Sequence, residues 1–145
     1  MEEKYIGVCH GKPGIGKTLS ARHFANWNIY LQNIQRKKQL TSDQLNVLAE
    51  SKTFFYTTPV LAAPKKTRTQ IIEGLIDFGD QVKLTRQQLG LSADKFMSEY
   101  CQLIIIDEAD RLKMTTLEEL RDLYDHLDAG MILIGMPGIE KRLSR

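Results

Sequence analysis

Eight residues near the N-terminus have the types and spacing that bind phosphate. They fit the pattern G-x-x-x-x-G-K-[ST] and comprise Gly11, Lys12, Pro13, Gly14, Ile15, Gly16, Lys17 and Thr18. Glycines in such a loop let the backbone fold round an anion without Cβ clashes, so that consecutive N–H groups can point at a β-phosphate. The lysine can bridge the β- and γ-phosphates, and the threonine hydroxyl can bind Mg²⁺. We therefore expect this loop, with the adjacent Leu19, to bind a nucleoside triphosphate, and Lys17 to take part in catalysis.

A second candidate site is a pair of adjacent carboxylates. The apolar run Leu103–Ile106 leads directly into Asp107 and Glu108. Such a run predicts a buried strand, and open parallel sheets bind ligands beyond the carboxyl ends of their strands, so both carboxylates should lie beside the phosphates. We expect Asp107 to hold Mg²⁺ and Glu108 to orient and deprotonate the water that attacks the γ-phosphate. The alternative is a solvated acidic pair that merely ends a strand.

The acidic pair favours hydrolysis or switching by ATP over transfer of phosphate to a bound acceptor. A glutamate next to the metal-binding aspartate separates water-using P-loop ATPases from P-loop kinases. No Asn-Lys-x-Asp motif for reading guanine occurs, so ATP is expected rather than GTP. Two short matches are interpreted as coincidences: Asp107–Asp110 spells a helicase box in a chain too short for two tandem domains, and Asp77–Gly79 spells a kinase triplet without its companion motifs.

The spacing of apolar residues predicts the elements that position these groups. Strands are expected at Tyr5–Cys9, Thr53–Thr58, Gln102–Asp107 and Met131–Gly135. A first helix is expected from Lys17, with Phe24, Trp27, Leu31 and Ile34 on one face, and a second after the N-cap Ser42. A third is expected through Ile71–Val82, with a break at Leu89–Gly90, and a fourth over Ala93–Tyr100 after the N-cap Ser92. The last is expected from a capping box at Thr116–Glu119 to the terminator Gly130. Strands that alternate with helices predict a mainly parallel sheet covered on both faces, an α/β three-layer sandwich.

Length and composition limit the class of protein. With 145 residues and 42% hydrophobic content, the chain can form one core, so a single domain over residues 1–145 is expected. The longest wholly apolar run is far shorter than the about 20 residues of a membrane span, and the N-terminus is no secretory signal, so a cytoplasmic protein without a membrane partner is expected. Cys9 and Cys101 lie in or beside apolar runs and are expected to be inert core thiols. A net charge of +2 does not by itself indicate nucleic-acid binding.

The chain resembles the AAA+ branch of P-loop ATPases, particularly the transposition-helper ATPases of the MuB/TniB type. Four stretches carry the resemblance: Gly11–Ala25, Tyr56–Ala63, Leu103–Leu112 and Ile132–Leu143. It implies an ASCE-type sheet in which the final strand lies between the strand before the phosphate loop and the strand before Asp107. Relatives usually carry a polar sensor residue at the end of that final strand, whereas this chain has Gly135-Met136-Pro137.

The resemblance also implies a set of partners. These are ATP with Mg²⁺, DNA, a transposase or other AAA+ client, and further copies of the same chain in a nucleotide-dependent oligomer. Lys65, Lys66 and Arg68 occupy the segment where such ATPases tend to contact DNA, although a solvated basic loop is the alternative. A helicase-loader or secretion-type ATPase is an alternative function, and an ATP-dependent binding module without catalysis is another.

The last expectation concerns turnover. The chain stops at Arg145, before the fifth strand, helical lid, sensor arginine and arginine-finger region that the resemblance implies. Arginine fingers contribute about 10³–10⁵ in rate in related chemistry, so nucleotide binding with little or no turnover is expected of this chain alone. Tyr5–Cys9 would then be a sheet edge open to self-association.

Overall fold

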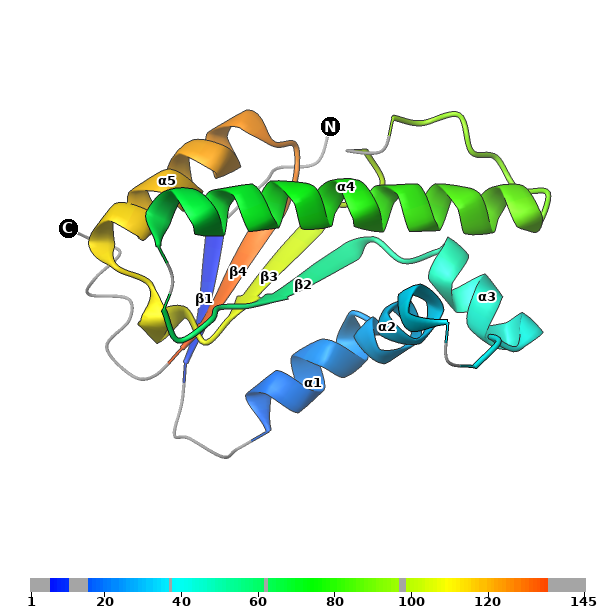
Figure 1. The fold of residues 1–145 in the computed structure, drawn as a ribbon, viewed down its shortest axis with the longest axis horizontal. Helices are drawn as coiled ribbons and strands as arrows, with labels where there is room; N and C mark the ends of the chain where they lie inside the picture. The colour runs from blue at the N-terminus through cyan, green and yellow to red at the C-terminus, as the bar shows by residue number, and fades with distance from the viewer. Residues whose placement is uncertain (1–5, 11–15, 37, 62, 97–98, 136–145) are drawn as a thin grey trace.

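One four-stranded parallel sheet forms the centre of the computed structural model (Figure 1). The structure describes residues 6–10, 16–36, 38–61, 63–96 and 99–135, and only the backbone of Cys9 and His10. The strands are β1 (Ile6–His10), β2 (Thr53–Thr57), β3 (Leu103–Asp107) and β4 (Gly130–Gly135), in the order β1-β4-β3-β2. All three pairings are parallel, and β4 lies between β1 and β3 as the resemblance implies.

The two central strands are buried on both faces, which explains their continuous apolar sequence. Ile104, Ile105 and Ile106 of β3 are all buried, and so are most residues of β4. Ile104 is level with Met131 and Ile106 with Leu133, so the carboxyl ends of β3 and β4 lie at the same edge of the sheet. A strand with helices on both sides has no polar face, so its sequence is an unbroken apolar run without the alternation of polar and apolar residues that marks a half-exposed strand.

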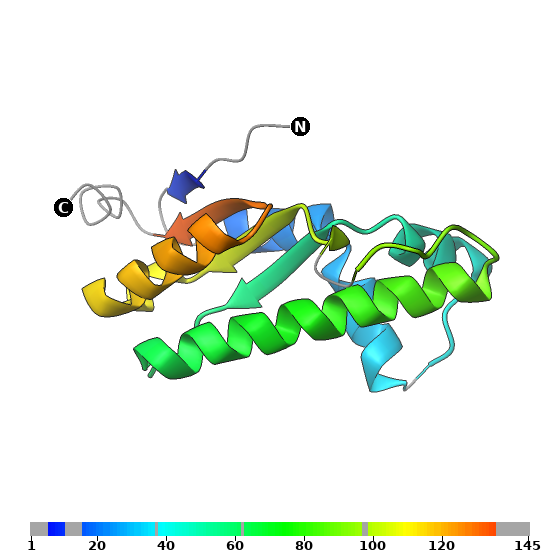
Figure 2. The ribbon, with the colours of Figure 1, turned by 90° about the horizontal axis from the view of Figure 1, so that it is seen from above.

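The helices form two outer layers. Helices α4 (Pro64–Gln88) and α5 (Met114–His126) lie side by side on one face of the sheet, and α1 (Lys17–Phe24) lies on the other (Figure 2). This division follows from right-handed crossovers, because the chain moves in one direction from β1 to β2 and in the opposite direction from β2 to β3 and β4. The predicted α/β sandwich with a parallel sheet is confirmed.

An aromatic cluster joins β2 to α4 and to α2 (Trp27–Gln35). The Trp27 ring lies 4.4 Å from Tyr30 and 5.5 Å from Phe54, and Phe54 lies 6.3 Å from Phe78 of α4. Gly74 lets α4 approach this closely, because a Cβ there would lie 2.6 Å from Phe54 Cζ. Burial, with a smaller contribution from nearby Asp77, raises the pKa of Tyr30 to about 12. This end of the molecule is therefore a densely packed aromatic core.

The predicted single helix from Lys17 is wrong, because it is two helices. The break falls at Ala25–Asn26, where Asn26 adopts a left-handed backbone with φ 54°. The turn gives α1 and α2 different faces, so Trp27 is buried while Phe24, at the end of α1, is exposed. Ile34, near the C-terminal end of α2, is exposed as well. Asparagine tolerates this conformation better than most residues, which is the local reason for the break.

Three predicted helix ends differ in the structure. The N-cap of α3 (Ser42–Ala49) is Thr41 rather than Ser42, in a capping box in which Thr41 Oγ1 accepts from Gln44 N at 3.2 Å. The Thr116–Glu119 capping box is wrong, because α5 already begins at Met114 and Thr116 is buried within it. Gly130 is the first residue of β4 and does not terminate α5.

Two further helix predictions, for α4 and for the segment between α4 and β3, also differ from the structure. Helix α4 is longer than predicted, starting with Pro64 in its first turn and ending before Gly90, which has φ 70°. Ala93–Phe96 is not helical, and Met97–Ser98 lies outside the described residues. Cys101 is a buried free thiol whose pKa burial raises to about 11, in agreement with the predicted inert role. No described helix is long and apolar enough to cross a membrane.

Candidate functional site

Of the predicted nucleotide-site residues, those that the structure describes lie at or beside the carboxyl edge of the sheet. β1 ends at His10, whose backbone is level with Gly135 at the end of β4. β3 ends at Asp107, one residue beyond the level of Leu133 in β4. Helix α1, which follows β1 in the sequence, begins near this edge, where β3 ends at Asp107 and Glu108 follows it (Figure 1). Ligands bind at this edge in open parallel sheets.

Lys17 reaches across this edge. Gly16 precedes it in a left-handed conformation with φ 80° and serves as the N-cap of α1, which favours glycine at this position. The Lys17 ammonium donates a hydrogen bond of 2.9 Å to the backbone oxygen of Gly135. Thr18 and Leu19 are exposed on the first turn of α1. The predicted phosphate-loop residues Gly11–Ile15 lie outside the described residues.

Asp107 is the most unusual polar group of the edge. Its side chain is buried, with 2% of the residue exposed, and its Oδ2 atom has no hydrogen-bond partner. The backbone oxygen of Asp107, by contrast, accepts from both Thr58 N at 3.0 Å and Thr58 Oγ1 at 2.9 Å. Burying an unpartnered carboxylate oxygen is costly, so such an atom indicates a ligand position. A hard carboxylate oxygen suits Mg²⁺, and the residue fits the cation that the sequence implies.

Glu108 occupies a strained turn directly after β3. Its backbone has φ 55° and ψ 41°, a conformation that costs on the order of 1 kcal/mol for a residue with a side chain. Such strain is concentrated at functional sites. The Glu108 carboxylate lies 4.0 Å from Arg111 Nη2 in the short helix η2 (Ala109–Arg111). Arg111 Nη1 also donates a hydrogen bond of 2.8 Å to the backbone oxygen of Thr58, the residue after β2.

Comparison with known proteins shows the family of this chain. A family model described as an AAA domain matches residues 1–143. The chain belongs to the AAA domain family. A Staphylococcus aureus protein named "Potential ATP-binding protein" is 41% identical over 154 residues. That alignment covers 100% of this chain and 55% of the relative, so the chain spans about half the length of that protein.

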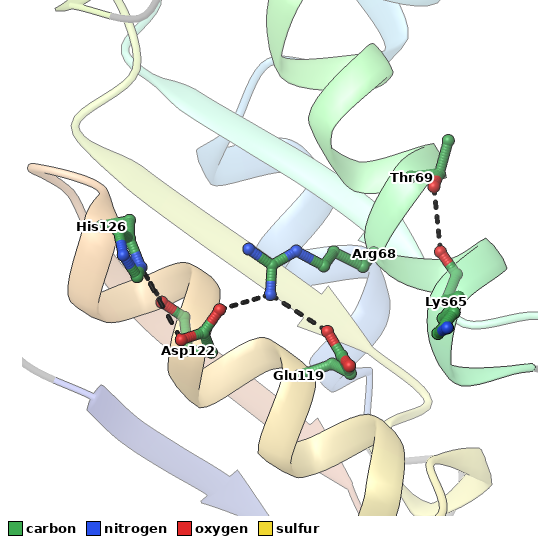
Figure 3. A network of polar contacts seen from close by, with 6 residues as sticks. All are labelled: Lys65, Arg68, Thr69, Glu119, Asp122 and His126. Carbon is green, nitrogen blue, oxygen red and sulfur yellow. Dashed lines mark hydrogen bonds and ion pairs between the residues drawn. The ribbon is translucent and has the colours of Figure 1, made fainter.

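The basic residues predicted to contact DNA divide into two kinds in this AAA domain. Lys65 and Lys66 are exposed in the first turn of α4. Arg68 instead reaches across to α5, where its Nη1 atom lies 3.0 Å from Glu119 and 2.5 Å from Asp122 (Figure 3). The hydrogen bond from Arg68 lowers the pKa of Asp122. The charge of Arg68 is therefore already balanced within the domain, whereas Lys65 and Lys66 are both exposed. Lys65 also lines an open cleft of about 690 Å³ between α4 and α5.

Sequence reasoning missed Thr58 and Arg111. Thr58 was expected only as the last residue of a strand, and Arg111 had no expected role. A signal was present for Arg111, because a cation three residues after a glutamate can pair with it on one helical turn. Thr58 gave none, since its bonds to Asp107 depend on the pairing of β2 with β3.

Proposed function

We propose that this AAA domain binds ATP with Mg²⁺ at the carboxyl edge of the sheet and hydrolyses ATP at the γ-phosphate, slowly when residues 1–145 act alone. The observation that carries the proposal is the buried, unpartnered Oδ2 of Asp107, at the same edge as the Lys17 ammonium on Gly135. A cation and an anion placed at one strand edge match the two opposite charges of a metal–triphosphate. The name of the staphylococcal relative supports ATP as the nucleotide.

Each residue has a separate role in this proposal. The backbone of Gly11–Gly16 and the start of α1 bind the β-phosphate, and Leu19 borders the nucleotide. Lys17 exchanges the Gly135 oxygen for the β- and γ-phosphates. Thr18 and Asp107 hold Mg²⁺, which neutralises charge on the phosphate oxygens when bound. Glu108 orients the attacking water and accepts its proton. Residues 1–145 act as one nucleotide-binding core.

The first experiment replaces Lys17 by alanine and measures affinity for a fluorescent ATP analogue with Mg²⁺. Loss of the ammonium is expected to weaken binding by about 100-fold, since charge-assisted bonds to phosphate are the strongest available to the site. Lys113→Ala is the matched control, because Lys113 is an exposed lysine whose side chain does not cap α5. Equal affinity of Lys17→Ala and Lys113→Ala would refute the proposed site.

Asp107→Asn tests the metal role through two effects of opposite sign. Without nucleotide, the variant is expected to melt no lower than the unmodified domain, because it replaces a buried carboxylate whose Oδ2 atom has no hydrogen-bond partner by a neutral amide. With Mg²⁺ and ATP, the rise in Tm should be largely lost, since the cation has lost its carboxylate. A variant that keeps the full Mg²⁺-dependent rise would exclude Asp107 as a metal ligand.

A finer proposal is that the ATPase serves DNA transposition, presenting target DNA to a transposase as a nucleotide-dependent oligomer. Its structural support is the pair Lys65 and Lys66, exposed where α4 begins after the carboxyl end of β2. Phosphates bound there would lie at the nucleotide edge of the sheet. Reversing both charges should weaken DNA binding and reduce its salt dependence by about two counterions. Unchanged affinity and slope, measured by anisotropy, would remove DNA from the proposal.

A further inference from the structure

We propose that Arg111 is a positioning residue that holds the Glu108 carboxylate in the orientation needed for hydrolysis; this rests on the proposed function of Glu108. The guanidinium of Arg111 faces two elements at once. Nη2 lies 4.0 Å from Glu108 Oε2, and Nη1 donates 2.8 Å to the Thr58 oxygen. Arg111 therefore connects the residue after β3 to the residue after β2.

The anchor of this connection is rigid. Thr58 uses both its N–H and its hydroxyl to bind the Asp107 oxygen, at 3.0 Å and 2.9 Å. Thr58 is itself fully buried. These bonds hold the end of β2 against the proposed metal ligand Asp107 at the end of β3. Arg111 in turn links Thr58 to Glu108. A planar guanidinium can serve two acceptors in fixed directions, which a lysine ammonium cannot do with the same geometry.

Glu108 needs such an anchor because little else holds its side chain. The carboxylate is 45% exposed, and among the described residues its ion pair is with Arg111. Its backbone is in a left-handed conformation, which aims the side chain but leaves its rotamers free. A general base must lie within hydrogen-bond reach of its water, and a misplacement of about 1 Å can cost about 100-fold in rate.

The experiment compares hydrolysis with binding. Arg111→Ala is expected to lower the single-turnover rate of ATP hydrolysis by about 10- to 100-fold while the Kd for ATP changes by less than about twofold. Arg111→Lys should restore only a small part of the rate, because it keeps the charge and loses the fork. Adding Arg111→Ala to Glu108→Gln should cause no further loss, since the two residues act as one unit.

The controls separate this inference from the function on which it rests. Lys113→Ala again serves as the matched loss of an exposed cation near α5. If Glu108→Gln hydrolyses ATP as fast as the unmodified domain, the proposed role of Glu108 is wrong, and the inference falls with it. If Glu108→Gln is slow but Arg111→Ala matches Lys113→Ala, the inference alone is wrong. Parallel loss of ATP affinity and rate in Arg111→Ala, or a faster rate, would also overturn it.

Discussion

Helices α1 and α4 differ sharply in how they are held. None of the residues of α1 is buried, and Leu19 and Phe24 are 72% and 65% exposed. Helix α4 buries seven residues, and Ile71 and Phe78 are completely inaccessible. The helix that carries the proposed phosphate ligands Lys17 and Thr18 thus contributes little to the core, while α4, which packs in the core, lacks the proposed catalytic groups. If α1 binds the nucleotide as proposed, stability and nucleotide binding are largely separated in this domain.

The separation makes physical sense. A nucleotide-binding helix is stabilised at its N-terminal end when an anion binds there, so it depends less on side-chain packing. The Lys17 bond to the backbone oxygen of Gly135 connects the first turn of α1 to the end of β4. On the other face, the aromatic cluster and the close approach allowed by Gly74 hold α4 against β2 whether or not a ligand is present.

Phe78→Ala should give the largest loss of stability. The ring is fully buried and lies among Trp27, Tyr30 and Phe54. Truncation of a buried phenylalanine costs about 3–5 kcal/mol, through lost transfer energy and the cavity left behind. Urea unfolding measures this loss, and ATP affinity of the folded fraction should stay unchanged. A loss below about 1 kcal/mol would contradict the assignment of the core to this region.

Much of the fold could be predicted from local sequence. Continuous apolar runs predicted β3 and β4 because both strands are buried on two faces. The order of the sheet came from the resemblance and not from periodicity, which carries no information about neighbours. The break at Asn26 was missed, because Phe24 and Trp27 are three residues apart and mimic one helical face.

The candidate site was predictable only where chemistry is encoded in adjacent residues. The phosphate-loop pattern and the Asp107–Glu108 pair are local motifs, and the structure places Lys17, Asp107 and Glu108 at one edge. Thr58 binds the backbone oxygen of Asp107 in β3, and Arg111 binds the backbone oxygen of Thr58 just after β2, so both contacts depend on the pairing of β2 with β3. The ion pairs of Arg68 were missed for the same reason, since Glu119 and Asp122 are more than 50 residues away in the sequence.

Arg68→Ala should lower the free energy of unfolding, measured in urea, by less than Phe78→Ala does. It removes the ion pairs between α4 and α5 but leaves the apolar core intact. Because these groups are partly exposed, the loss should shrink as NaCl rises from about 0.05 to 0.5 M. The lowered pKa of Asp122 means that the pair stabilises the domain at neutral pH and loses its effect as the carboxylate is protonated in acid.

Glu119→Gln provides the partner variant for this test. If Arg68 acts through Glu119 and Asp122, the combined variant should lose less stability than the sum of the two single losses. Strict additivity, or a loss that does not depend on salt, would show that the Arg68 side chain stabilises the domain by packing instead.

Phe24→Ala should have the smallest effect and is the direct counterpart of Phe78→Ala. The same side chain is removed from α1 in one variant and from α4 in the other. Phe24 is the last residue of α1 and largely exposed, so little apolar area returns to water, and alanine is the better helix former. The free energy of unfolding should change by less than about 0.5 kcal/mol. A loss close to that of Phe78→Ala would mean that α1 belongs to the same cooperative core as α4, and that nucleotide binding and stability are coupled through α1.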